Sequence, residues 1–229
     1  ERKNRVGWLG LVTKPIPDNT TLWFSEGRMT ESLHPLQNAW VLWEHKSSTT
    51  KDPTKWKENM KQLCEFTTME EFWQNFNNLP KPSEVFFDGQ CKKKIGEDGR
   101  TVAEYSLFKK GIEPEWSDPQ NTIGGEWFCR QSFELEILDL YWINLVMGLV
   151  GETIEDAINS DSKGNDHLNG VRVVDKSRGS LPQYRLEVWI NTRDAVVRDR
   201  VKQRLIDVAV NGQDSANRTV PRFSWKDHV

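Results

Sequence analysis

Residues 184–191, YRLEVWIN, alternate strictly between two sets of side chains, and this two-residue period is typical of a β-strand. The apolar set, which we expect helices to cover, is Tyr184, Leu186, Val188 and Ile190. The opposite set, which should line an open face, is Arg185, Glu187 and Trp189. A chain with such a strand needs a sheet that is buried on one side only.

The rest of the chain mixes strands and helices without a regular βαβ alternation. Thr68 and Glu71 have the spacing of a capping box, and Ser132 is the predicted cap of the longest amphipathic helix. A third helix is expected over 193–208. Further strands are predicted at 39–45, 105–110, 126–130 and 168–177. The pattern favours an α+β fold with a largely antiparallel sheet.

The 229 residues are enough for one domain with a sizeable core. We expect an N-terminal arm over 1–33 and a single domain over 34–229, with a mobile inserted loop at about 86–100. The three cysteines lie far apart, as in proteins of a reducing compartment. With neither a signal-peptide pattern nor a long apolar stretch, a cytoplasmic protein is expected.

The formal net charge of −3 argues against a protein that coats nucleic acid through its phosphates. Any contact with RNA must therefore come from a local site. The chain has 11 tryptophans but only 3 tyrosines, which suggests that some tryptophans stack on a flat ligand. Those in strands or on helix faces are assigned to the core: Trp40, Trp43, Trp127 and Trp142.

Trp56 and Trp116 instead lie in polar loops, where exposed stacking residues are common. Lys176 and Arg178 end the strand that precedes 184–191, close to Arg185. A basic cluster beside Trp189 suits an aromatic ring that carries phosphates. Alternatively, the basic cluster is only a solvated charged face, and the two loop tryptophans only pack their loops against the domain.

Catalytic patterns are missing from the sequence. It has no nucleophile motif, no glycine-rich phosphate loop before a helix and no paired catalytic carboxylates. His34 has no partnering histidine or cysteine nearby, so a metal role is not expected. We therefore expect neither an enzyme nor a cofactor.

Several segments resemble the translation initiation factor 4E family, and they occur in the family's order. The most specific are HPLQNAWVLWEH at 34–45 and YSLFKKGIEPEW at 105–116. The others are EEFWQNF at 70–76, GGEW at 124–127, LDLYWINLVMGLVGE at 138–152 and the LEVWIN strand. The resemblance implies a curved antiparallel sheet with helices on its convex face and a monomeric protein that binds the 7-methylguanosine cap of mRNA.

The resemblance also implies roles for single residues at the cap. The methylated guanine would lie between Trp56 and Trp116, with Trp189 against the methyl group. The phosphates would meet Lys176, Arg178 and Arg185. Ser117 stands where the family has the glutamate that reads guanine, so we expect Glu115 or Asp118 to supply that carboxylate.

The convex face would bind a helix with the pattern Tyr-x-x-x-x-Leu from a scaffold or repressor protein. The matching residues are His34, Pro35, Met69, Trp73, Ile143, Met147 and Gly151. Asn144 replaces the family's usual acid, which predicts a partner choice different from that of other members. Trp73 and Met147 could equally be core residues.

Three functions remain in competition on the sequence. The first is a cap-binding translation initiation factor. The second is an interaction module or translational repressor that binds the cap weakly, with Ser117 as its signature. The third, an enzyme that hydrolyses capped nucleotides, lacks an acidic cluster for magnesium.

Overall fold

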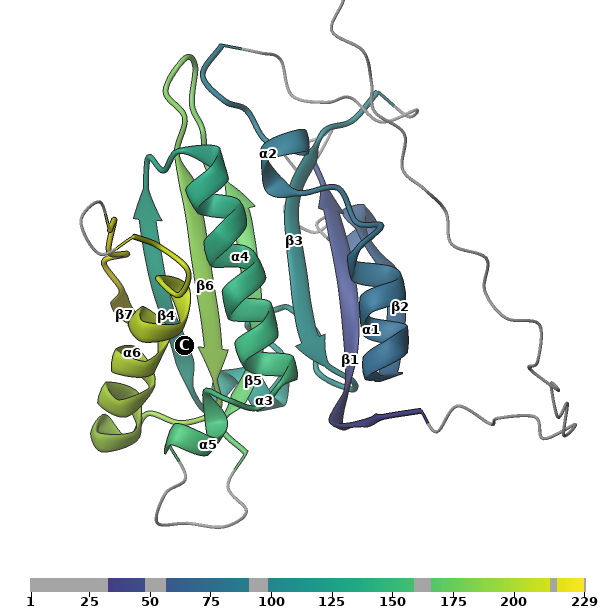
Figure 1. Ribbon diagram of the computed structural model, residues 1–229, viewed down its shortest axis with the longest axis vertical. Helices are drawn as coiled ribbons and strands as arrows, with labels where there is room; N and C mark the ends of the chain where they lie inside the picture. Colours follow the sequence, from purple (N-terminus) through teal and green to yellow (C-terminus); the bar gives the residue numbers. More distant parts are fainter. Residues whose placement is uncertain (1–32, 48–56, 91–98, 159–165, 215–217, 229) are drawn as a thin grey trace, which may run out of the picture. The chain divides into compact units, whose positions relative to one another are not determined.

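The computed structural model describes residues 33–47, 57–90, 99–158, 166–214 and 218–228, in which one seven-stranded sheet forms the centre (Figure 1). The strand order is β2-β1-β3-β5-β6-β4-β7, and every neighbouring pair is antiparallel. The strands are β1 Pro35–Lys46, β2 Met60–Thr68, β3 Val102–Lys109, β4 Gly125–Gln131, β5 Leu168–Asp175, β6 Tyr184–Ile190 and β7 Ser224–Asp227. The predicted arm lies outside this part of the chain, apart from Leu33.

Three longer helices, α1 (Met69–Phe76), α4 (Leu135–Val150) and α6 (Ala195–Ala209), lie on the same face of the sheet (Figure 1). The shorter ones are α2 Pro82–Val85, α3 Pro119–Thr122, α5 Glu155–Ile158 and the 3-10 turn η2 Lys57–Asn59. The predicted α+β class, with helices on one face of a curved antiparallel sheet, is confirmed.

The hydrophobic core lies between the helices and the sheet, where the alternation of strand β6 places its apolar side chains. Leu186, Val188 and Ile190 have no exposed surface, and neither do Leu138 and Leu145 of α4. No helix of this size among the described residues covers the other side of the sheet, so the alternate side chains of β6 remain available for a site.

The predicted capping box opens α1. The Thr68 hydroxyl accepts a hydrogen bond from the Glu71 amide at 3.3 Å, and the Glu71 carboxylate accepts the Thr68 amide at 3.2 Å. The helix therefore begins at Met69, as the spacing indicated.

The predicted cap of α4 is wrong. Ser132 instead donates its hydroxyl to the Pro182 carbonyl at 2.8 Å, and the helix begins after Glu134. Strands β2 and β7 were not predicted. Of the four tryptophans assigned to the core, Trp43 is only half-buried.

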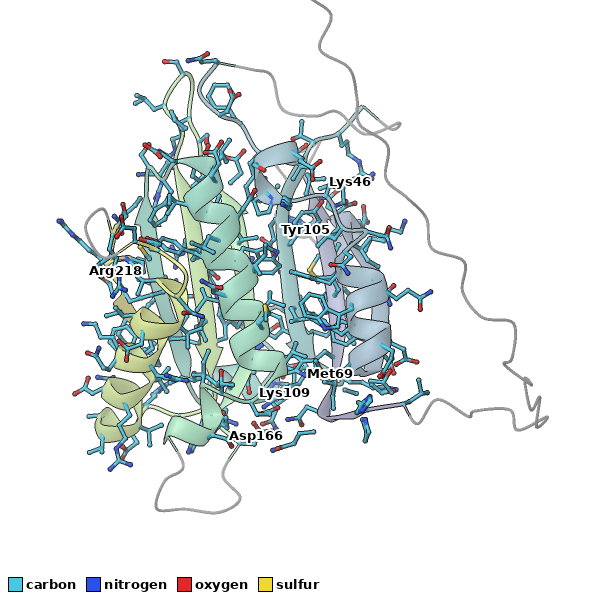
Figure 2. All side chains as sticks on the ribbon, viewed as in Figure 1. Lys46, Met69, Tyr105, Lys109, Asp166 and Arg218 are labelled. Carbon is cyan, nitrogen blue, oxygen red and sulfur yellow. The ribbon has the colours of Figure 1, made fainter. Side chains whose placement is uncertain are left out.

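Side-chain contacts connect strands β3 and β5 at one end of the sheet. Lys109, the last residue of β3, and Asp166, just before β5, point toward one another and form an ion pair (Figure 2). Glu155 accepts hydrogen bonds from the amides of His167 and Leu168, at 2.9 and 3.0 Å. These contacts hold β3 and β5 in place as the base for the side chains of the site.

Candidate functional site

A cavity of about 560 Å³ opens over strands β5 and β6, and its size is within the usual range of small-molecule sites. It lies on the side of the sheet that the core helices do not cover, because the odd-numbered side chains of β6 line it. Its walls are Pro114, Glu115, Trp116, Ser117, Arg172, Lys176, Arg185, Glu187, Trp189 and Lys226.

Trp116 is held in the cavity wall by a well-bonded loop between β3 and β4. Asp118 caps α3 through the Gln120 amide at 2.8 Å and also accepts the Glu113 amide at 2.9 Å. The Asn121 side-chain amide donates to the carbonyls of Glu113 and Glu115. The loop thus presents a large aromatic ring that is 49% exposed, an unusual state for tryptophan in a folded domain.

The face of the Trp116 ring already attracts a positive charge. The Lys226 ammonium, from the edge strand β7, lies 3.9 Å from the centroid of that ring. This is cation–π geometry, and it places an electron-rich aromatic face at the cavity.

Glu115 and Asp118, the two carboxylates expected to read guanine, differ in position. Asp118 is engaged with two backbone amides and does not line the cavity. Glu115 does line it and forms an ion pair of 2.5 Å with Lys57. Burial and the neighbouring Glu113 raise the pKa of the Glu115 carboxyl, although Lys57 opposes this shift. Glu115 is therefore the carboxylate that the geometry leaves for a ligand.

Trp189 lies in the cavity floor, on the face of the sheet where the alternation of β6 places it, and not on an exposed surface. It has no solvent-exposed area and packs edge-on against Phe108, with its ring centroid 4.3 Å from that of His228. Its indole nitrogen donates to the Glu187 carboxylate at 2.9 Å.

The predicted basic cluster is divided by the structure. Lys176 and Arg185 line the cavity, whereas Arg178 is exposed in the turn that pairs with Leu181. Although the Lys176 side chain reaches solvent, desolvation within the cavity lowers the pKa of its ammonium. The prediction that Arg178 joins the cluster is therefore not supported by its position.

Among the charged lining residues, the sequence reasoning missed Arg172 and Lys226, and it placed Glu187 on the open face without giving it a role. The alternation of Val171, Arg172 and Val173 places Arg172 on the open face, so that pattern could have identified it. Lys226 belongs to a four-residue strand near the end of the chain, and no local pattern indicated its place beside Trp116.

Trp56, the second predicted stacking residue, lies outside the described residues. Lys57, which follows it in sequence, is described and contacts both Glu113, at 3.0 Å, and Glu115. The Lys57 contacts connect η2 to the loop that carries Trp116.

The residues predicted for protein binding belong to the helix side of the sheet. His34 and Pro35 are exposed, and the Glu70 carboxylate accepts a hydrogen bond from the His34 ring at 2.6 Å, which lowers the pKa of Glu70. The His34 carbonyl accepts the Met69 amide at 2.9 Å. These contacts fix the start of β1 against the first turn of α1.

Trp73 of α1 and Ile143 of α4 line one small cavity of about 130 Å³. Trp73 is half-buried and packs against the core, so it is both a core and a surface residue. Met147, one turn after Ile143, is 43% exposed, and Gly151 at the end of α4 is exposed as well. An apolar stripe along α4 is therefore open to a partner.

Asn144 has an internal structural role. Its side-chain amide donates to the carbonyls of Ala209 and Asn211, at 2.9 and 2.8 Å, just where α6 ends. The residue satisfies carbonyls that a helix end leaves free.

None of the described helices is long and apolar enough to cross a membrane. Within the part of the chain that the structure describes, no three histidine, cysteine or acidic side chains come together as a potential metal site.

The geometry defines a two-layer α+β domain whose uncovered sheet face carries an aromatic, charged cavity. The family model of "Eukaryotic initiation factor 4E" matches residues 35–217, which include most of that cavity. The chain therefore belongs to the eukaryotic initiation factor 4E family.

Relatives within the family are distant in sequence. Eukaryotic translation initiation factor 4E-2 of Schizosaccharomyces pombe is 33% identical over 176 residues, which is 76% of this chain and 61% of that protein. The factor 4E of Candida albicans is 30% identical over 75% of this chain and 71% of its own length. The chain thus spans less than two thirds of the fission-yeast relative.

Solved structures with this fold include complexes from two nematodes. Ascaris suum eIF4E-3 with an m2,2,7G cap has a TM-score of 0.63 at 27% identity, over 86% of this chain and 92% of that one. Caenorhabditis elegans eIF4E-3 with the 4E-binding protein Mextli has a TM-score of 0.60 at 28% identity, over 84% and 93%.

Proposed function

We propose that this protein binds the 7-methylguanosine cap of mRNA and recruits it for translation initiation, as a factor of the cytoplasm. The observation that carries the proposal is the exposed Trp116 ring in the cavity wall, with a cation already over its face and Glu115 beside it. Membership of the factor 4E family and the cap complex of the Ascaris suum relative support it.

The methylated base suits this wall for a physical reason. Methylation at N7 gives the purine a positive charge, and each indole face that stacks on it contributes about 1–2 kcal/mol when desolvated. Trp116 provides one face, and we propose Trp56 for the other. The contact of Lys57 with Glu115 supports this pairing, because Lys57 is the next residue after Trp56.

The guanine edge needs an acceptor, since it carries two adjacent N–H donors. We propose that Glu115 supplies its carboxylate, and that the Ser117 hydroxyl in the same wall is a weaker, additional acceptor. Asp118 takes no part in this proposal, because its oxygens already accept two backbone amides.

Glu115→Gln should lower the affinity for 7-methyl-GTP by about tenfold or more, because an amide replaces the charged carboxylate that accepts the hydrogen bonds. The parent should also prefer 7-methyl-GTP to 7-methyl-ITP, which lacks the 2-amino donor, and the variant should lose this preference. Tryptophan fluorescence titration measures both. In the parent, affinity should fall as the pH drops toward the raised pKa of Glu115, at a higher pH than for an ordinary glutamate.

Glu113→Gln is the matched control, because Glu113 also pairs with Lys57 but does not line the cavity. It should bind both nucleotides as the parent does. If Glu115→Gln also behaves like the parent, the carboxylate serves only Lys57, and the proposed reading of guanine is wrong.

Recruitment requires a second surface. We propose that the open stripe of α4 and the adjoining α1 bind a helix of the form Tyr-x-x-x-x-Leu from a scaffold or repressor protein. The exposed Met147 and the cavity between Trp73 and Ile143 support this. The Mextli complex of the Caenorhabditis elegans relative is consistent with it.

The remaining parts of the proposal concern organisation. We propose that residues 34–229 form the cap-binding domain of a monomer, that residues 1–33 form an arm and that residues 86–100 are an inserted loop. Phe86 at the start of this loop is buried, and Phe87 donates its amide to Asp175 at 3.2 Å. These contacts support a loop that is anchored on the sheet at its beginning.

A further inference from the structure

The floor of the cavity is an ion network rather than a group of free cations. Arg172 contacts Glu104 on the neighbouring strand β3 through two nitrogens, at 3.0 and 2.5 Å. It also lies 3.3 Å from a carboxylate oxygen of Glu187 on β6. Both carboxylates and the guanidinium are almost fully buried, so each charge needs the others.

The second guanidinium of the floor, that of Arg185, is engaged in the same way. Its Nε lies 2.6 Å from Glu187, and its Nη2 donates to Glu126 on strand β4. Glu126 has no exposed surface. Glu187 thus lies between the two arginines, and it also accepts the Trp189 indole N–H.

The carboxylates outnumber the guanidinium groups of the floor, since two arginines face Glu104, Glu126 and Glu187. His45 lies 3.9 Å from Glu104, and His228 lies 3.5 Å from Glu126. Burial opposes the charged form of Glu187, but Arg172 and Arg185 lower its pKa, so the acid stays ionised. The floor therefore carries no surplus of positive charge.

An incoming phosphate would have to compete with these carboxylates for both arginines. Of the basic side chains that the structure describes in the cavity wall, Lys176 and Lys226 are the two without a carboxylate in ion-pair contact. Both lysines are exposed, and contacts between exposed charges are weak. The base-stacking wall, by contrast, is fixed by the hydrogen bonds of its loop.

We propose that this cavity recognises its ligand mainly through the methylated base, so that a 7-methylguanosine triphosphate binds less than about thirtyfold tighter than the monophosphate. The inference rests on the proposed cap binding, which it deepens. Glu126 and Glu187 are the residues that set this selectivity, because they neutralise the arginines that would otherwise hold phosphates.

The test is a comparison of 7-methyl-GMP, 7-methyl-GTP and GTP by calorimetry on the parent protein. The triphosphate should bind less than about thirtyfold tighter than the monophosphate, the most that two exposed ion pairs supply. A larger ratio overturns the inference while leaving cap binding intact. If GTP binds as well as 7-methyl-GTP, it is the proposed function that fails.

Glu126→Gln removes one carboxylate charge from the floor but keeps the shape of the side chain. In the variant, the ratio of the affinity for 7-methyl-GTP to that for 7-methyl-GMP should rise about three- to tenfold, because part of Arg185 becomes available to phosphate. Glu136→Gln makes the same change of charge on α4, across the sheet, and should leave the ratio unchanged. If the folded Glu126→Gln protein has the same ratio of affinities as the parent, the inference is contradicted. If the variant does not fold, the ratio measured on the parent protein decides the inference.

Discussion

Trp116→Ala should reduce the affinity for 7-methyl-GTP by at least about tenfold, since the loss of one stacking partner costs about 1–3 kcal/mol. The quenching of tryptophan fluorescence by the ligand should fall as well, because the ring nearest the base is gone. Trp116→Phe keeps an aromatic face and should show a smaller loss. Fluorescence and calorimetric titrations measure the two effects separately.

The Trp116 ring is half exposed, so the melting temperature of the alanine variant should lie within a few degrees of that of the parent. That near-parental melting temperature makes the binding result interpretable. Parental affinity in a folded Trp116→Ala protein would exclude this wall from the cap site.

Met147→Asp should lower the affinity for a Tyr-x-x-x-x-Leu peptide by at least about thirtyfold. A loss of this size is typical when an apolar residue at the centre of an interface is replaced. Affinity for 7-methyl-GTP should stay at the parental value, because α4 and the cavity lie on opposite sides of the sheet. Met147 is a better target than Trp73, which packs against the core as well. Fluorescence anisotropy of a labelled peptide checks the first result, and a nucleotide titration checks the second.

Val196→Asp is the control for this variant, since Val196 is a similarly exposed apolar residue on a different helix, α6. It should leave peptide binding unchanged. Equal losses in both variants would mean that a negative charge on the helix layer weakens the peptide wherever it is placed, and the stripe of α4 would not be the docking surface.

Local patterns were sufficient for much of the fold. The alternation in 184–191, the capping box at Thr68 and the long amphipathic stretch of α4 all lead to the observed elements. The start of α4 was misplaced because the Ser132 hydroxyl bonds to a distant turn at Pro182, which no local signal reveals. Asp118 could have been foreseen as a cap, because it directly precedes the proline that opens α3.

The charge balance of the site could not be predicted from single segments. Arg185 and Lys176 look like a free basic cluster in sequence, but Glu126 comes from another strand. That contact depends on the register between strands β4 and β6, in which Arg130 and not Glu126 is opposite Arg185. Long side chains then reach diagonally across the ladder, a contact that depends on the three-dimensional arrangement.

Retention on immobilised 7-methyl-GTP tests the central claim of cap binding most directly. The protein should bind the resin and be eluted by free 7-methyl-GTP, but not by the same concentration of GTP, because plain guanine lacks the positive charge that stacking favours. Elution by both nucleotides alike, or passage of the folded protein through the resin without retention, would contradict the account.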